Sequence, residues 1–142
     1  MDLMISVDDS IPDNRWWKEL FRLYARSGEY FEIHCWSDEA AELALAKRYG
    51  STACYSMPDI KIVHGILTDE LIRFFLQEEK PTDCRCYNKM VPFFTVRIGR
   101  TYSSEKYGTK ILLTSKGPSE EESIEKIISN IADHAKLFRS ES

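Results

Sequence analysis

Hydrophobic residues recur with two different periods along the chain, and these periods predict where strands and helices lie. Residues 1–7 and 30–36 alternate apolar and polar side chains, which is the period of a strand. Between them, Trp16, Leu20 and Leu23 lie at helical spacing. The first half of the chain is therefore expected to alternate strands and helices.

Three further segments have the pattern of helices. One is rich in Ala and Leu and begins after Ser37, and another begins at Thr68, a favourable cap residue. The last begins with an S-x-x-E capping box at Ser119 and Glu122. Its apolar residues form one stripe at helical spacing: Ile124, Ile127, Ile128, Ile131, Ala135 and Phe138.

The remaining apolar segments predict strands and complete the expected fold. Residues 51–56 and 60–64 are short strands, and residues 91–98 and 110–115 form a hairpin across a loop at 99–109. The expected fold class is α+β with an α/β-like first half. A single mixed sheet of about five to six strands is covered by about four helices, with a C-terminal β-hairpin and a final amphipathic helix.

Length and composition favour one folded domain. The chain has 142 residues, of which 43% are hydrophobic and 30% charged, so it is too apolar to be disordered. We expect a single globular domain over residues 1–138 and a frayed tail over 139–142. No segment resembles an export signal or a membrane helix, which predicts a cytoplasmic protein with four reduced cysteines and no membrane partner.

The net charge of −4 conceals two oppositely charged regions. Residues 1–42 carry ten acidic and four basic side chains, a net charge of −6, whereas residues 85–116 carry seven basic and one acidic, a net charge of +6. The basic region also contains several aromatic residues. That combination is compatible with a protein interface, a nucleic-acid surface or a solvated strand face. Any binding hypothesis must therefore state which charged surface it uses.

The sequence contains no established catalytic motif. No phosphate-binding loop, dinucleotide fingerprint or nucleophile elbow is present, so no catalytic residue and no cofactor are assigned. Cys84 and Cys86 form an isolated C-x-C pair, which is a weak metal signal because zinc usually takes four ligands from paired motifs. No metal site is assigned either, although reactivity of the two thiols stays open.

We predict a small cytoplasmic protein-binding protein, in concrete form an immunity or antitoxin-type inhibitor that occludes a toxic enzyme. Its supporting features are the small size, the acidic charge, the many Trp and Tyr residues and the lack of an evident site. The candidate partner contacts come from both charged regions. They are Asp8, Asp9, Asp13, Trp17, Trp36, Asp38, Glu39, Arg97, Arg100, Tyr102, Lys106 and Tyr107.

Two alternatives from other classes stay open. The first is a small enzyme that uses His34 or His64 with Asp8, Asp9 or Glu32, which requires these side chains to converge in one pocket. The second is a nucleic-acid-binding module that works through the basic hairpin region at 85–116.

Overall fold

The computed structural model describes residues 2–54, 57–82 and 88–140 as a sheet layer and a helix layer. The strands are β1 (Asp2–Val7), β2 (Tyr30–Trp36), β3 (Ser51–Thr52), β4 (Ile60–Ile66), β5 (Thr95–Ile98), β6 (Tyr102–Glu105), β7 (Lys110–Thr114) and β8 (Ala135–Ser140). The helices are α1 (Arg15–Tyr24), α2 (Ala40–Ala46), α3 (Asp69–Gln77) and α4 (Pro118–Ser129).

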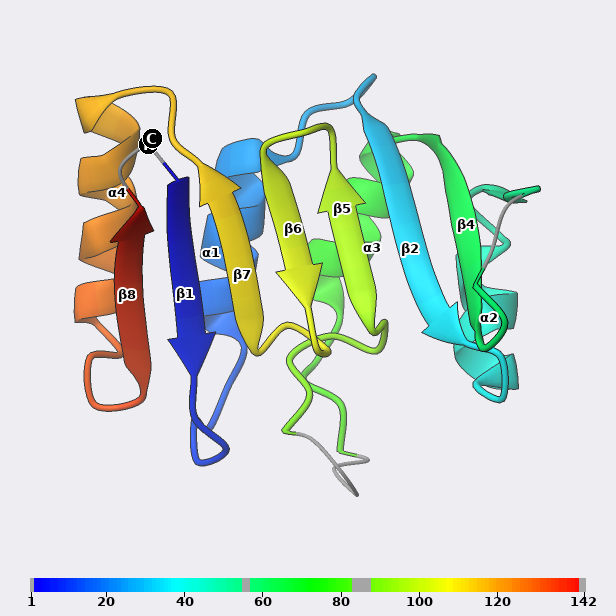
Figure 1. The fold of residues 1–142 in the computed structure, drawn as a ribbon, viewed down its shortest axis with the longest axis horizontal. Coiled ribbons are helices and arrows are strands. Elements are labelled where there is room, and N and C mark those ends of the chain that lie inside the picture. Colours follow the sequence, from blue (N-terminus) through cyan, green and yellow to red (C-terminus); the bar gives the residue numbers. More distant parts are fainter. Residues whose placement is uncertain (1, 55–56, 83–87, 141–142) are drawn as a thin grey trace.

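One sheet contains all eight described strands, in the order β3-β4-β2-β5-β6-β7-β1-β8 (Figure 1). Every pair of neighbours is antiparallel. The α+β class is confirmed, but the predicted mixed sheet of five to six strands is wrong. Although strands and helices alternate at first, β1 and β2 are not neighbours, because β5, β6 and β7 lie between them.

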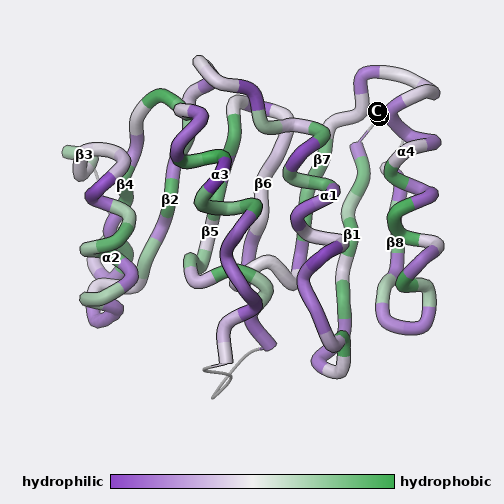
Figure 2. The backbone as a smooth tube through the Cα atoms, turned by 180° about the vertical axis from the view of Figure 1, so that it is seen from behind, coloured by the Kyte–Doolittle hydropathy of each residue, from purple (hydrophilic) through white to green (hydrophobic). Residues whose placement is uncertain are grey.

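The four described helices lie on the same face of the sheet, as Figures 1 and 2 show from opposite sides. The alternation in β1 decides which side chains meet them: Leu3, Ile5 and Val7 are buried, whereas Asp2 and Met4 point to the other face. The prediction that helices cover the sheet is therefore correct for one face only. The opposite face is called the open face below.

An aromatic cluster fills the centre of the core between α1, α3 and β6. The Trp17 ring stacks on Phe21 at a centroid distance of 5.2 Å and lies 5.8 Å from Phe75. Its indole Nε1–H donates a 2.9 Å hydrogen bond to Ser104 Oγ, which satisfies a buried donor. Trp16 is also buried.

The predicted hairpin has an additional strand. The region expected to be a loop contains β6, which pairs with β5 on one side and β7 on the other. Its four residues alternate strictly in burial, with Tyr102 and Ser104 facing the core. Because serine occupies two of the four positions, the segment lacks the hydrophobic content by which strands are recognised from sequence.

The predicted final helix is also corrected. The helix α4 begins at Pro118, one residue before the expected capping serine, and ends at Ser129. The chain then turns and forms β8 alongside β1, with Phe138 opposite Met4. Pairing continues through Ser140 opposite Asp2, two residues into the expected frayed tail. The residues expected to extend the helix to Phe138 instead include a strand that is hydrogen-bonded to β1.

The cap of α3 is confirmed. Thr68 Oγ1 accepts a 3.2 Å hydrogen bond from the backbone N–H of Leu71, and Asp69 and Glu70 lie in the first turn.

Replacing Thr68 by alanine is expected to destabilise the protein by about 1 kcal/mol, because one amide at the start of α3 loses its acceptor. Thermal unfolding followed by circular dichroism should show a fall in Tm of a few degrees. Thr68→Ser keeps the hydroxyl and serves as the control. Equal melting of Thr68→Ala and Thr68→Ser would show that the cap contributes nothing.

Candidate functional site on the open face of the sheet

The strand register places one side chain from every described strand in a single row across the open face. The row is made by direct Cα partners in successive strand pairs. From β8 to β3 it reads Phe138, Met4, Leu112, Ser103, Arg97, Glu32, His64 and Ser51. The row is therefore apolar from β8 to β7 and polar or charged from β6 to β3.

Large exposed hydrophobic side chains concentrate on this face. Five are exposed among the described residues, and four of them, Tyr30, Ile66, Leu112 and Phe138, lie on the open face with exposed fractions of 37–58%. The fifth, Met57, lies before β4. The four on the open face form two pairs, Tyr30 with Ile66 on β2 and β4, and Leu112 with Phe138 on β7 and β8. Single exposed apolar residues are common on soluble proteins, but several on one face favour a binding surface.

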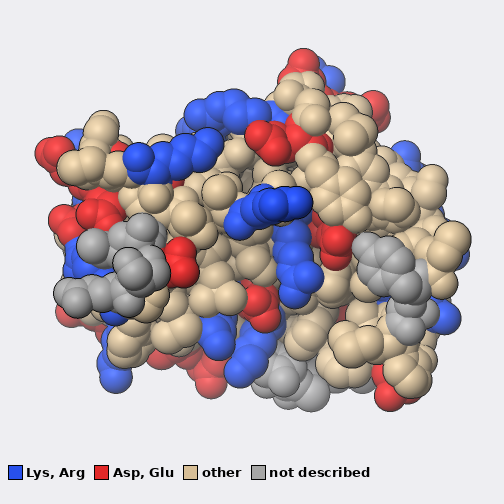
Figure 3. Space-filling model, turned by 45° about the horizontal axis from the view of Figure 1, so that its top comes forward, with Lys and Arg blue, Asp and Glu red and all other residues tan. Residues whose placement is uncertain are grey.

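A groove occupies the apolar half of the open face and is called the open-face groove here. Met4 lies between Leu112 and Phe138 in the register, and the groove extends from them to Arg97 and Arg100. Its volume is about 590 Å³, within the range of sites that hold a small ligand or a protein side chain. Figure 3 shows Lys and Arg side chains across the middle of the molecule and along its upper edge.

The polar half of the row centres on Glu32. Tyr30 Oη–H donates a 3.0 Å hydrogen bond to Glu32 Oε2, and His34 Nε2 lies 2.9 Å from Glu32 Oε1. Arg97 Nη1 approaches the same oxygen at 3.9 Å. The side chains of Glu32 and His34 are only 16% and 8% exposed. Two neighbouring strands thus place a carboxylate among three donors on the open face.

These donors lower the pKa of Glu32. Partial burial acts to raise it, but the hydrogen bonds from His34 and Tyr30, together with the positive charges of His34 and Arg97, outweigh burial. The pKa therefore lies below the ordinary value of 4.5. At a pH where Glu32 is ionised in both the folded and the unfolded state, it stabilises the folded state. That contribution disappears as the pH falls through the lowered pKa of the folded state.

Glu32→Gln is expected to cost about 1 kcal/mol of stability at neutral pH, because the neutral amide loses the charge-assisted contacts. The difference from the parent protein should shrink as the pH falls from about 4.5, where Glu32 of the unfolded chain begins to be protonated, through the lowered pKa of Glu32 in the folded state. Urea unfolding at pH 7 and at acidic pH measures both differences. A gap that stays constant with pH would contradict the stated role of the charge.

A second polar and aromatic cluster joins the end of β2 to the turn between β6 and β7. Tyr107 Oη–H donates a 2.9 Å hydrogen bond to Glu39 Oε2, and Glu39 Oε1 accepts another from the backbone N–H of Trp36. The Lys89 Nζ lies 4.5 Å above the Tyr107 ring. Tyr107 and Glu39, both predicted partner contacts, therefore bind each other across the fold.

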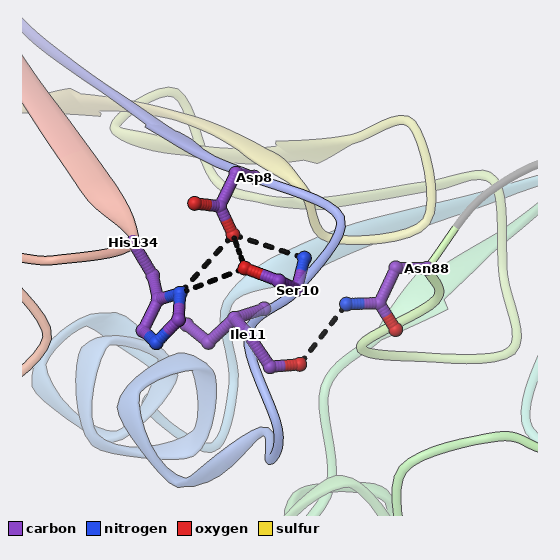
Figure 4. A network of polar contacts seen from close by, with 5 residues as sticks. All are labelled: Asp8, Ser10, Ile11, Asn88 and His134. Atoms are coloured by element: carbon purple, nitrogen blue, oxygen red, sulfur yellow. Dashed lines mark hydrogen bonds and ion pairs between the residues drawn. The ribbon is translucent and has the colours of Figure 1, made fainter.

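The cluster of Asp8, Ser10 and His134 has the residue types of a catalytic triad but a different geometry (Figure 4). Ser10 Oγ–H donates to Asp8 Oδ1 at 2.9 Å, and His134 Nδ1 lies 3.2 Å from the same oxygen and 3.1 Å from Ser10 Oγ. A triad histidine contacts the acid and the nucleophile through different ring nitrogens. Here both contacts use Nδ1, so the cluster closes a turn after β1 and does not activate Ser10.

Hydrogen bonds from Ser10 lower the pKa of Asp8 more than its slight burial raises it, and His134 adds to this effect. The backbone N–H of Ser10 also donates to Asp8 Oδ1 at 3.0 Å, which defines the turn. These contacts define a turn directly after β1.

The structure does not bring the predicted partner contacts together. Trp17 and Tyr102 are buried in the core, so their rings offer almost no surface to a partner, and both assignments are corrected to core positions. Residue type alone does not show that these two aromatic side chains, one on α1 and the other on β6, face the core. Arg97 and Arg100 line the open-face groove, and Lys106 lies in the turn after β6 with a φ of 51°.

The acidic contacts are divided between two places. Asp8, Asp9 and Asp13 lie between β1 and α1, whereas Asp38 and Glu39 lie between β2 and α2. The strands β5, β6 and β7 separate β1 from β2. The enzyme alternative requires His34 or His64 to meet Asp8, Asp9 or Glu32. The structure places Glu32, His34 and His64 on the open face, whereas Asp8 lies elsewhere, beside His134.

Most of the predicted cysteine chemistry lies outside what the structure describes, because residues 83–87 contain the C-x-C pair. Within residues 2–54, 57–82 and 88–140, no group of three or more His, Cys, Asp or Glu side chains is placed to hold a metal ion. Burial raises the pKa of the Cys35 thiol to about 12, with Glu39 and Glu42 adding to the effect. Cys35 is therefore a core thiol.

The apolar residues of the open face were missed in the sequence. Met4, Leu112 and Phe138 become a site only once β7, β1 and β8 are known to be adjacent, and Phe138 was expected in a helix. The one sequence feature that points to this face is the alternation in β1, which places Met4 on the opposite face of the strand from Leu3 and Ile5.

Comparison of the chain with protein-family models, with curated proteins and with solved structures found no match. Within the described part of the chain, no helix combines the length and hydrophobicity required to cross a bilayer. The class of this protein is therefore given by its own geometry: an eight-stranded antiparallel sheet with helices on one face and an amphipathic open face.

Proposed function

We propose that this chain is a protein-binding protein whose partner covers the open face of the sheet. One observation carries the proposal: four of the five exposed large hydrophobic side chains of the described residues gather on that face. Water-exposed apolar area of this kind is removed from solvent when a partner binds, which favours association.

The open face is large enough for such an interface. Eight strands at a spacing of about 4.8 Å span about 34 Å across the sheet. Strands of up to seven residues extend for about 23 Å in the other direction. A typical stable interface takes about 800 Å² from each partner, and these dimensions are of that order.

The concrete form that we propose is an inhibitor of the immunity or antitoxin type, which acts in the cytoplasm by occluding another protein. The small size, the net charge of −4 and the absence of an established catalytic motif support this form. A rigid sheet face suits occlusion, because little conformational entropy is lost when a preformed surface binds.

The nucleic-acid alternative has less support. Tyr102 and Tyr107 of the basic region are buried and cannot stack on bases. The carboxylates of Asp2, Glu32 and Glu105 lie on the same face as Arg97, so the open face lacks the continuous stripe of positive charge that a phosphate backbone requires.

Site-specific photo-crosslinking in the native host tests the proposal. A benzophenone amino acid at Phe138 samples the open face, and the same group at Glu122, an exposed position of α4, samples the helix layer. We expect one protein to be crosslinked in high yield from position 138 only. Equal yields from both positions, or none from position 138, would contradict a partner on the open face.

A further inference from the structure

The open-face groove also bears on the chemistry of the partner. We infer that the partner inserts a segment with a large apolar side chain and a nearby carboxylate, the apolar group on Met4, Leu112 and Phe138 and the carboxylate on Arg97 and Arg100. The inference rests on the proposed function and answers a question that the sequence leaves open, namely which charged surface the protein uses.

The floor of the groove favours an apolar group. In the register, Leu112 and Phe138 flank Met4 on the two neighbouring strands, so three apolar side chains form a continuous strip. Leu112 and Phe138 are 37% and 47% exposed, so a bound side chain would remove substantial apolar area from water. Methionine also adapts its shape to different partners, which suits a contact surface.

The end of the groove favours an anion. Arg97 reaches it from β5, and Arg100 reaches it from the turn between β5 and β6. The Arg97 side chain is 47% exposed and its distance of 3.9 Å from Glu32 leaves donors of the guanidinium directed elsewhere. Guanidinium groups recognise carboxylates well, because each offers a planar fork of donors, and two of them line this groove.

The acidic groups on the same face do not cancel this preference. Glu32 is held by Tyr30 and His34, and it lies on the far side of Arg97 from the groove in the strand order. Asp2 lines the groove, where its carboxylate accepts a 3.2 Å hydrogen bond from Thr114 Oγ1. A partner carboxylate is therefore best placed at the β5 end, away from Asp2 on β1.

The geometry also sets the spacing within the partner segment. Arg97 on β5 and Leu112 on β7 are separated by two strand spacings, or about 10 Å. An extended peptide covers that distance in about three residues. The carboxylate and the apolar side chain should therefore be about three residues apart.

Among the residues that the structure describes, the acidic regions offer no comparable site. Asp8 and Asp13 lie between β1 and α1, and Asp38 lies beyond β2, none of them beside an exposed large hydrophobic residue in the register of the open face. The carboxylate of Asp8 is occupied by Ser10 and His134, and that of Asp13 by Arg15.

A methionine-methyl NMR titration of the whole protein tests the inference. The probe is a short acetylated peptide with two glutamates, a two-glycine spacer, and a leucine and a phenylalanine. Its counterparts carry lysines in place of the glutamates, or serines in place of the leucine and phenylalanine. We expect the glutamate peptide to move the Met4 methyl signal, while Met90, buried in the core, stays unchanged. The two counterparts should bind about fivefold more weakly or worse.

Matched charge variants complete the test. The double variant Arg97→Gln/Arg100→Gln is expected to weaken the glutamate peptide about fivefold and to reduce the dependence of binding on salt. The double variant Arg73→Gln/Lys126→Gln removes the same charge from the helix layer and should bind like the parent protein. Equal binding of the lysine peptide, or no difference between the two double variants, would overturn the inference.

Failure of the inference is distinguishable from failure of the proposed function. If no peptide moves Met4 while position 138 still crosslinks one protein, the partner uses the open face with different chemistry and the inference is wrong. If position 138 crosslinks nothing and no peptide binds, both are wrong. Binding of the glutamate peptide alone, lost in the open-face double variant, supports both.

Discussion

Trp17→Ala is expected to destabilise the fold by about 3–5 kcal/mol, one of the largest losses of any single side chain here. The indole ring packs against Phe21, Phe75 and Tyr102 at centroid distances of 5.2, 5.8 and 6.4 Å, so its removal leaves a cavity between α1, α3 and β6. It also leaves Ser104 Oγ without its indole partner. Because small proteins are stable by only about 5–15 kcal/mol, this is a substantial fraction of the total.

Two further variants separate the packing of Trp17 from its hydrogen bond. Trp17→Phe keeps most of the ring and should cost clearly less than Trp17→Ala. Ser104→Ala keeps the ring and leaves the buried indole N–H unsatisfied, at a cost of about 1–3 kcal/mol. Urea unfolding followed by circular dichroism measures all three. A loss below about 1 kcal/mol for Trp17→Ala would show that Trp17 is not part of the core.

Gly108→Ala is the second substitution with a large expected effect, about 2–5 kcal/mol. The backbone of Gly108 has a φ of +87°, which costs an L-residue about 1–2 kcal/mol. An added Cβ would also lie 2.8 Å from Met90 Cβ and 3.0 Å from the Trp17 ring, closer than packing allows. Because both neighbours are buried in the core, the clash adds about 1–3 kcal/mol.

Gly28→Ala is the matched control for this prediction. Gly28 has a similar φ of +98°, but nothing lies within 4 Å of an added Cβ, so only the backbone strain remains. Its expected cost is about 1–2 kcal/mol. Unfolding free energies of the two variants give the steric part directly as a difference. Equal losses would mean that Gly108 does not lie against the core as described.

Part of the fold can be predicted from local sequence patterns, and part of it cannot. The alternation of β1 is readable because one face of the strand is buried and the other is not. The helix α3 is readable because its cap and first-turn acids are local features. The packing of Gly108 on Trp17 joins residues that are distant along the chain, so no local pattern contains it.

The C-terminal segment shows why a regular pattern can mislead. Ile131, Ala135 and Phe138 continue the helical spacing of α4, yet the last two lie in β8. Pairing with β1 decides this, because the antiparallel β1–β8 ladder satisfies backbone groups along six residues. A competition between a local helix and a distant ladder is not visible in the spacing of apolar residues.

The candidate site was partly foreseeable. The charge separation pointed to the region of Arg97 and Arg100, and these residues do line the open-face groove. The apolar partners Met4, Leu112 and Phe138 come from three strands whose adjacency follows from the sheet order alone. Only the structure shows that the helices leave this face uncovered, and that is the basis of the proposed function.

The most direct measurement is the dissociation constant of the complex between this protein and the partner identified by crosslinking from position 138. It is compared between the variants Leu112→Asp and Met57→Asp of this protein. Both variants place a carboxylate at an exposed large hydrophobic position, but only Leu112 lies on the open face. We predict at least a tenfold weakening for Leu112→Asp, as for a central interface residue, and unchanged affinity for Met57→Asp. Equal affinities for the two variants would contradict binding through the open face.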